Sequence, residues 1–278
     1  MEKFLAGGTA MEKRRKKGRG KIRLRPRFYV IMSLFFGTLS MFVYLIVRPA
    51  APMLEELPVF NEAPPEMDSV ALLDINNPLS HLLVAIDPGH GGIDDGAIAY
   101  FNGQLIRESE VVLSISLELE RLLTQAGIQV VMTRRTDEYV DLGERTLIAN
   151  HAGADLLISV HNNSFISSEP SGIETLYFQS HDQRAVSSGE FAGVVQDRLV
   201  EALNLLDRGA RPEELYILRW ANMPGILVEI GFMSNLGDLE IISSPYGQSR
   251  SARAIYLGLL DYFQIRGYQV PPEAFLLQ

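Results

Sequence analysis

The chain of 278 residues contains no cysteine, and this absence excludes several kinds of chemistry. A structural disulfide, a zinc site with thiolate ligands and a cysteine nucleophile all need a side chain that the protein does not have. Any bound metal ion must therefore take its ligands from histidine, aspartate or glutamate.

Two familiar catalytic motifs are also absent or incomplete. No Gly-x-Ser-x-Gly sequence occurs, so a serine hydrolase has little support. Gly91 and Gly92 lie in a glycine-rich turn of the kind that cradles phosphate, but no Gly-Lys-Ser/Thr sequence follows. Phosphate binding therefore stays a minor alternative.

The charge of the chain is distributed unevenly. Residues 1–27 carry eleven Lys/Arg and two Asp/Glu, so this segment is +9 and the rest of the chain, within a total of −9, is −18. Binding to nucleic acid needs clustered Lys and Arg, which the acidic body lacks, so nucleic acid is not expected as a partner. The basic segment ends where a long apolar run begins, which indicates membrane topology instead.

The apolar run from Phe28 to Val47 contains no charged residue and is long enough to cross a bilayer as a helix. We expect residues 28–48 to form a transmembrane signal anchor, with residues 1–27 as a basic cytoplasmic tail. The protein would then be a single-pass protein of the cell membrane, with its catalytic domain outside the cytoplasm. A cleaved signal peptide is the alternative, but the run is long and no clear cleavage site follows it.

The rest of the chain predicts a linker, one folded domain and a tail. Residues 49–80 are rich in Pro, Glu and Asn and resemble a linker. Residues 81–266 have about the length of one domain, and residues 267–278 form a C-terminal tail. Strands are expected at residues 81–86, 128–133, 154–160, 173–178 (at an edge), 215–218 and 226–230. Helices are expected at residues 108–125, 142–151, 189–206 and 248–263.

This alternation of strands and helices predicts the fold class. We expect a single three-layer α/β domain with a mainly parallel or mixed sheet and helices on both faces, preceded by one transmembrane helix. Ligand sites of open α/β sheets lie beyond the carboxyl ends of the strands. Ionisable residues that end or follow strands are therefore the first candidates for a site.

Four residues meet this condition. His90 follows the first strand, His161 ends the third, Glu229 lies within the late apolar strand, and Glu108 begins the helix after the glycine-rich turn. Two histidines and one carboxylate suit Zn²⁺, which leaves a fourth position for water. We therefore predict one zinc ion held by His90, Glu108 and His161, with Glu229 as general base and acid in amide or ester hydrolysis.

Each of these residues also has an ordinary structural explanation. Glu108 at a helix start suits the helix dipole, and a histidine after a turn or at a strand end needs no function. Glu229 is the hardest to explain in this way, because an acid inside an apolar strand is half-buried and needs a partner or a role. The remaining histidines, His81, His151 and His181, are interpreted as structural or surface residues.

Several segments together resemble the zinc-dependent N-acetylmuramoyl-L-alanine amidases of the bacterial cell wall, of the amidase-3 type. The matching stretches include IDPGHGGIDDGA (residues 86–97), LLISVHNN (residues 156–163), GIETLYF (residues 172–178) and NMPGILVEIGFMSN (residues 222–235). The resemblance covers roughly residues 82–264 in the order of the family's motifs. It implies a single α/β domain and one zinc ion per catalytic domain.

The reaction implied by the resemblance is hydrolysis of the amide bond between N-acetylmuramic acid and L-alanine of the peptidoglycan stem peptide. The family's metal ligands fall on His90, Glu108 and His161, and its catalytic glutamate falls on Glu229. Substrate contacts are a weaker expectation for Asn163, Arg208 and Arg219, where solvation of a loop or strand end is nearly as good an explanation. Some members of this family carry an inserted helix that covers the zinc site and inhibits the enzyme. Here one amphipathic helix and a loop fill residues 180–214, so no such inhibitory helix is expected.

Two rival functions remain open from the sequence. One is a membrane-anchored binding or scaffold protein that keeps the fold without turnover. The other is a zinc peptidase that cuts within the stem peptide. The sequence identifies neither a protein activator nor the process served, whether growth, division, sporulation or germination.

Overall fold

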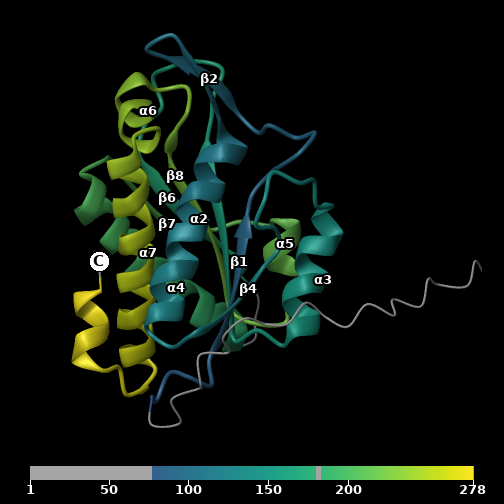
Figure 1. Ribbon diagram of the computed structural model, residues 1–278, viewed down its shortest axis with the longest axis vertical. Helices are drawn as coiled ribbons and strands as arrows, with labels where there is room; N and C mark the ends of the chain where they lie inside the picture. The colour runs from purple at the N-terminus through teal and green to yellow at the C-terminus, as the bar shows by residue number, and fades with distance from the viewer. Residues whose placement is uncertain (1–76, 180–182, 278) are drawn as a thin grey trace, which may run out of the picture. The chain divides into compact units, whose positions relative to one another are not determined.

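The computed structural model describes residues 77–179 and 183–277 (Figure 1). The transmembrane helix predicted at residues 28–48, its basic flank at residues 1–27 and nearly all of the linker lie outside these residues. None of the helices within them combines the length and the apolar character that crossing a bilayer requires.

The described residues form strands and helices in alternation. The strands are β1 (Leu83–Pro88), β2 (Ile98–Phe101), β3 (Gln104–Arg107), β4 (Gln129–Met132), β5 (Leu156–Asn163), β6 (Ile173–Tyr177), β7 (Asp207–Pro212) and β8 (Gly225–Phe232). The helices are α2 (Glu108–Gln125), α3 (Leu142–Ala152), α4 (Gln183–Leu203), α5 (Tyr216–Arg219), α6 (Leu236–Ile242), α7 (Pro245–Ile265) and the 3-10 helix η1 (Pro272–Leu276).

The main sheet has six strands in the order β4-β1-β5-β8-β6-β7. Strands β4, β1, β5 and β8 are parallel to one another, whereas β6 runs antiparallel to β8 and parallel to β7. A single α/β domain with a mixed sheet is therefore confirmed. The four parallel strands bring their carboxyl ends to one edge of the sheet, where a ligand site is expected.

Helices cover both faces of the sheet (Figure 1). Helices α2, α4 and α7 pack on one face, and their buried side chains, such as Ile115 and Leu259, belong to the larger core. The opposite face is covered by α3 and α5, whose Ala149 and Leu218 belong to a smaller core. The second face thus carries fewer helices, and the functional cleft described below lies there.

Helix α2 has the bounds that the sequence predicts. Apolar residues recur along it at spacings of three and four, and Val112, Ile115 and Leu119 are buried against the sheet. Gly127, with a φ of 79°, follows the helix and allows the chain to turn into β4. The amphipathic pattern thus determines the orientation of the helix whose first residue is Glu108.

The strand predicted at residues 215–218 is wrong, because these residues begin the short helix α5. A run of four apolar residues has no periodicity that distinguishes a strand from one turn of a buried helix. Strand β8 already pairs with β5 on one side and β6 on the other, so residues 215–218 could not pair with it as a further strand. Ile217 and Leu218 instead pack onto the sheet face.

The edge position predicted for residues 173–178 is also wrong, because β6 lies between β8 and β7. Strand β7 is the true edge, and its sequence DRGARP carries no apolar alternation. Charged residues and proline are typical of edge strands, which must avoid pairing with other chains. The sequence of β7 therefore resembles a loop, and the strand is not predicted from it.

Further elements differ from the sequence analysis, among them the short helix α6 after β8, which the sequence analysis does not predict. Strands β2 and β3 form a separate antiparallel hairpin that was not predicted. Its turn residues Asn102 and Gly103 both have positive φ, of 50° and 78°, as a tight two-residue hairpin turn requires. At the other end of the chain, η1 lies within the predicted tail and docks on α7, where Tyr256 donates a hydrogen bond to the carbonyl of Ala274.

Candidate active site

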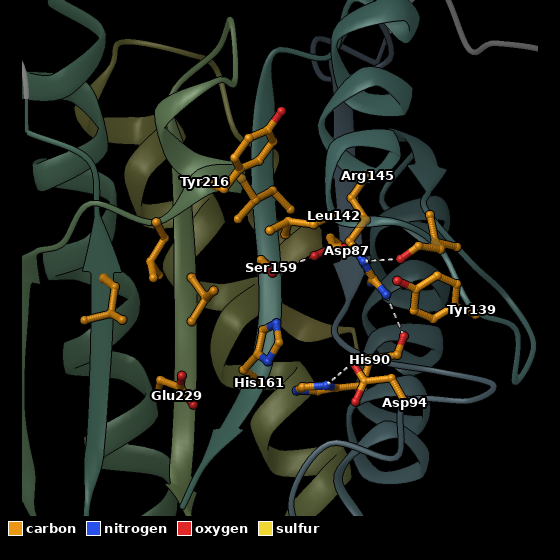
Figure 2. A pocket seen from close by; sticks show the side chains of 15 residues that line it. Asp87, His90, Asp94, Tyr139, Leu142, Arg145, Ser159, His161, Tyr216 and Glu229 are labelled. Carbon is orange, nitrogen blue, oxygen red and sulfur yellow. Dashed lines mark hydrogen bonds and ion pairs between the residues drawn. The ribbon is translucent and has the colours of Figure 1, made fainter. Parts of the chain in front are cut away.

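A cleft of about 430 Å³ lies on the sheet face that α3 and α5 cover. Side chains from the ends of β1, β5 and β8 line its floor, and residues of α3 and α5 form its walls (Figure 2). His90, His161 and Glu229 all line this cleft. The carboxyl ends of the parallel strands thus bring together three of the four residues singled out in the sequence.

The fourth residue, Glu108, completes a compact group with the two histidines. One atom from each of His90, Glu108 and His161 lies within 4.8 Å of the others. Glu108 Oε1 is 3.1 Å from His90 Nε2 and 3.0 Å from His161 Nδ1. The structure therefore places the three predicted metal ligands around one point.

Three different elements position these ligands. His161 lies near the end of β5, and Glu108 is the first residue of α2. His90 follows β1 and has a φ of 58°, a left-handed conformation that is uncommon for residues other than glycine. The backbone turns sharply at His90 and directs its imidazole toward the end of the neighbouring strand.

Two glycines of the turn make room for the ligand side chains. A Cβ atom on Gly89 would lie 2.2 Å from Cε1 of His161, and one on Gly96 would lie 2.7 Å from Oε2 of Glu108. Neither distance is sterically allowed, so both positions must be glycine for the site to form. Gly89 and Gly96 thus allow the close approach of His161 and Glu108.

Asp94 orients His90 from behind. The Nδ1 atom of His90 is 2.9 Å from Asp94 Oδ2, which leaves Nε2 directed at the metal site. Burial lowers the pKa of His90, but the hydrogen bonds and charges of Glu108 and Asp94 outweigh this and raise it to about 9. Metal-bound histidines commonly have such a carboxylate partner on the second ring nitrogen.

Glu108 is held as a carboxylate by its surroundings. Its Oε2 accepts a hydrogen bond from the backbone N–H of Ala97, and its Oε1 accepts one from Asn162 N. Burial alone would raise the pKa of Glu108, but the hydrogen bonds from His161 and His90 lower it well below its usual value. The buried side chain therefore presents a negative charge to the two histidines.

Glu229 lies beside this group on the adjacent strand. It is paired in register with His161 across β5 and β8, and Figure 2 shows His161 between Glu229 and His90. The side chain is half-buried, as predicted, and among the described residues its Oε2 has no hydrogen-bond partner. Burial raises the pKa of Glu229 to about 7, against the opposing effect of His161. Such a carboxyl group can both accept and donate a proton near neutral pH.

The donor set and its spacing fit a zinc ion. Two ligands of a tetrahedral zinc ion, each bonded at about 2.0–2.1 Å, lie roughly 3.3 Å apart. The two contacts between Glu108 and the histidine nitrogens, at 3.1 and 3.0 Å, are close to this spacing. Nitrogen ligands with one carboxylate also match the chemical preference of zinc.

The three residues predicted to contact substrate lie in different surroundings. Asn163 ends β5, and its amide donates a hydrogen bond to Glu174, a buried residue paired in register with Glu229. Arg208 on β7 is 3.7 Å from the same carboxylate. Arg219 instead pairs with Glu214 on the surface and does not line the cleft. None of the three lines the cleft, but Asn163 and Arg208 contact Glu174, whose partner on the neighbouring strand is Glu229.

Several residues of the site were missed in the sequence. Asp87 and Arg145 lie buried at the cleft floor and form an ion pair of 2.9 Å, and Tyr139 and Tyr216 line the wall. Asp94 carried a detectable signal, since it lies four residues after His90 in the same turn. The others come from separate elements, so only the folded chain shows their proximity.

The two other histidines among the described residues do not belong to the site. His81 and His151 are exposed and do not line the cleft. His181 lies outside the described residues. The interpretation of His81 and His151 as surface residues agrees with their positions.

Fold and site together define an α/β domain with a His-Glu-His group that can hold a metal ion and a half-buried glutamate beside it. This constellation is suited to metal-assisted hydrolysis. Residues 84–261 match the protein family described as N-acetylmuramoyl-L-alanine amidase. The chain belongs to this family. The matched residues include all four members of the predicted site.

Individual relatives agree with this assignment. The chain is 34% identical over 200 residues to N-acetylmuramoyl-L-alanine amidase LytC of Bacillus subtilis, covering 72% of this chain but 39% of LytC. It is 32% identical over 211 residues to the germination-specific N-acetylmuramoyl-L-alanine amidase of the same organism, covering 70% and 85% of the two chains. The chain therefore spans about two fifths of the length of LytC.

A solved structure shows the same fold. N-acetylmuramoyl-L-alanine amidase AmiC2 of Nostoc punctiforme superimposes with a TM-score of 0.60 at 36% sequence identity. The match covers 66% of this chain and 97% of that structure. The shared region is thus nearly the whole AmiC2 structure.

Proposed function

We propose that the protein is a zinc-dependent N-acetylmuramoyl-L-alanine amidase that hydrolyses the bond between N-acetylmuramic acid and L-alanine of the peptidoglycan stem peptide. The observation that carries the proposal is the convergence of His90, Glu108 and His161 within 4.8 Å, in a cleft that also holds Glu229. Membership of the amidase family supports the choice of substrate.

His90, Glu108 and His161 would hold the zinc ion. Bound there, zinc supplies a Lewis acid that polarises the scissile carbonyl group and acidifies water. The protein supports this by fixing the ligands: Asp94 orients His90, and the N–H groups of Ala97 and Asn162 hold the two oxygens of Glu108. The ligands are therefore arranged before the ion arrives.

Glu229 would move the proton. Its carboxylate takes a proton from the attacking water as the new bond between oxygen and the lactyl carbonyl carbon forms. It then gives this proton to the alanine nitrogen as the carbon–nitrogen bond breaks, so that a carboxylic acid and a free amine are released. The raised pKa of Glu229, about 7, suits a group that must carry out both transfers near neutral pH.

Asn163 and Arg208 would contribute to substrate binding. Both contact Glu174, which is paired with Glu229 on the sheet, and this supports a position near the scissile bond. Arg219 is a poorer candidate because its guanidinium group pairs with Glu214 away from the cleft.

The proposal includes the membrane anchor. The uncharged run from Phe28 to Val47 and its basic flank support a single span at residues 28–48 with the catalytic domain on the outer side. An anchored amidase would act on wall close to the membrane. An epitope placed after residue 60 should be open to external protease in intact cells, and protection of that epitope would contradict the topology.

Digestion of purified peptidoglycan by the full chain with added zinc tests the activity. New amino termini of L-alanine on released peptides, with intact glycan strands, are the expected products. Cuts between amino acids would identify a peptidase instead. A folded, zinc-loaded chain that binds peptidoglycan without cutting it would identify a binding protein.

A further inference from the structure

The turn that carries His90 is held by two buried arginines from other parts of the chain. The carbonyl groups of Pro88, Gly89 and His90 all point into the protein, where they need hydrogen-bond donors. All three accept hydrogen bonds from the guanidinium groups of Arg134 and Arg145. Both arginines are buried, at 2% and 6% exposure.

Arg145 reaches the turn from α3. Its Nη1 donates to the carbonyl of Pro88 at 2.7 Å, and its Nη2 donates to the carbonyl of His90 at the same distance. Its Nε donates to the carbonyl of Val140 at 3.1 Å, just before α3 begins. One planar guanidinium group thus fixes His90 relative to α3, which a lysine with a single nitrogen cannot do.

Arg134 follows β4 and connects the turn to a second metal ligand. Its Nη2 donates to the carbonyl of Gly89 at 2.7 Å and to the carbonyl of Ser109 at 2.9 Å. Gly89 precedes His90, and Ser109 follows Glu108. A single nitrogen atom therefore joins the backbone beside one proposed ligand to the backbone beside another.

Asp87 extends the same network to the third ligand. Its Oδ1 accepts a hydrogen bond from Arg145, and its Oδ2 accepts one from the hydroxyl of Ser159 at 2.7 Å. Ser159 lies two residues before His161 on β5 and on the same face of the sheet. The buried polar network thus contacts the chain next to all three proposed ligands.

Burying these two arginines lowers the stability of the fold through the loss of their hydration. Asp87 is the one acidic side chain that pairs with either guanidinium group among the described residues, and removing charged groups from water is unfavourable. Burial and the proximity of Arg145 lower the pKa of Arg134. Apolar residues of similar volume could fill the space but would leave the carbonyl groups of Pro88, Gly89 and His90 without donors, so the arginines are tied to the geometry of this turn.

We infer that Arg134 and Arg145 are positioning residues that hold the proposed ligands His90 and Glu108 at the spacing a metal ion needs. This inference rests on the proposed zinc site. Neither arginine would touch the metal ion. They act through the left-handed backbone at His90 and through the start of α2.

Zinc affinity of the full chain tests the inference. Arg134→Lys and Arg145→Lys keep the charge but lose the forked set of donors. We expect the dissociation constant for Zn²⁺, measured by competition with a chelator, to rise by about 10–100-fold in each variant, as when other groups that orient metal ligands are removed. The visible spectrum of bound Co²⁺ should change as well, because the ligand geometry is altered.

Two controls separate positioning from general stability. Arg135→Lys alters the adjacent arginine, which is half-exposed and pairs with Glu120, and should bind zinc like the wild type. Leu259→Ala removes a buried side chain in α7 and should lower the melting temperature without changing zinc affinity while the protein is folded. Folded lysine variants that bind zinc as tightly as the wild type would overturn the inference.

A milder variant tests the positioning network if both lysine variants fail to fold. Ser159→Ala removes only the link between Asp87 and β5, and we expect a several-fold rise in the zinc dissociation constant. Unchanged zinc binding by Ser159→Ala would then count against a positioning network. A wild-type chain that binds no zinc would instead refute the proposed function itself.

Discussion

Glu229 is the residue on which the proposed chemistry depends most directly. Its strand is otherwise apolar, and one carboxylate oxygen has no hydrogen-bond partner among the described residues. A buried polar atom without a partner lowers stability. The presence of this acid in the floor of the cleft is therefore explained by function better than by folding.

Replacing Glu229 by glutamine should abolish turnover without removing the metal. The amide has nearly the same shape but cannot take the proton from water, so we expect hydrolysis of peptidoglycan to fall by about 10²–10⁴-fold. Zinc affinity should stay within a few-fold of the wild type. Release of L-alanine amino termini and chelator competition measure the two effects. Glu240→Gln, on the exposed side of α6, is the control, and a fully active Glu229→Gln variant would refute the assignment.

Asp94 should contribute to metal affinity through His90. Asp94→Asn weakens the partner of His90 Nδ1, while the amide oxygen can still accept the hydrogen bond from Gly96. We expect zinc to bind about 10-fold more weakly or worse. The matched control is Asp95→Asn, which alters the neighbouring acid that pairs with Arg107 on the surface. Equal affinities of the two variants would show that Asp94 does not orient the ligand.

At the scale of elements, the sheet places the site and the helices on its other face support the sheet. Helices α4 and α7 pack so closely that Gly258 lies against the backbone of α4, and a Cβ atom there would be 2.8 Å from Val195 Cα. Gly193 also lies in α4 but has no atom within 4 Å of such a Cβ position. A substitution of Gly258 therefore tests the packing between the helices, whereas a substitution of Gly193 tests helix propensity alone.

The pair Gly258→Ala and Gly193→Ala should change stability in opposite directions. Alanine at position 258 forces the two helices apart, at a cost of about 1–3 kcal/mol that exceeds the gain in helix propensity. Alanine at position 193 should raise the free energy of unfolding by about 0.5–1 kcal/mol. Urea unfolding of the full chain measures both. Stabilisation by both substitutions would mean that α4 and α7 are not in close contact.

For the whole molecule, metal binding should be coupled to pH through His90. In the metal-free protein Glu108 and Asp94 outweigh the effect of burial and raise the pKa of His90 from 6.5 to about 9. The protonated imidazole therefore stabilises the metal-free fold fully below pH 6.5, and this contribution is lost as the pH rises through 9. Zinc needs the neutral imidazole, so binding near pH 7 must release this proton.

The expected result is a zinc affinity that increases from pH 6.5 to pH 9. Calorimetric titrations in buffers of different ionisation enthalpy should also show proton release at pH 7. The absence of proton release, together with an affinity independent of pH over this range, would contradict a protonated His90 in the metal-free site. Arg135→Lys, which alters a half-exposed arginine that pairs with Glu120, should show the wild-type dependence.

Much of the fold and of the candidate site could be predicted from the sequence. The amphipathic period of residues 108–125 determined α2, because burial of one helix face depends only on local spacing. The chain order of His90, Glu108, His161 and Glu229 at strand and helix ends identified the candidate site, since parallel strands share one carboxyl edge. The uncharged run from Phe28 to Val47 predicts a membrane span at residues 28–48, which lies outside the described residues and stays a prediction.

Other features depend on contacts between distant residues. Strand β7 has no apolar alternation and exists because β6 offers it an edge, whereas residues 216–219 become a helix because both sides of β8 are occupied. The arginines that hold His90 come from the end of β4 and from α3, 44 and 55 residues farther along the chain. Periodicity and local motifs describe which residues an element buries. Only tertiary packing decides which carbonyl groups are left inside without donors, and therefore which two arginines must be buried to satisfy them.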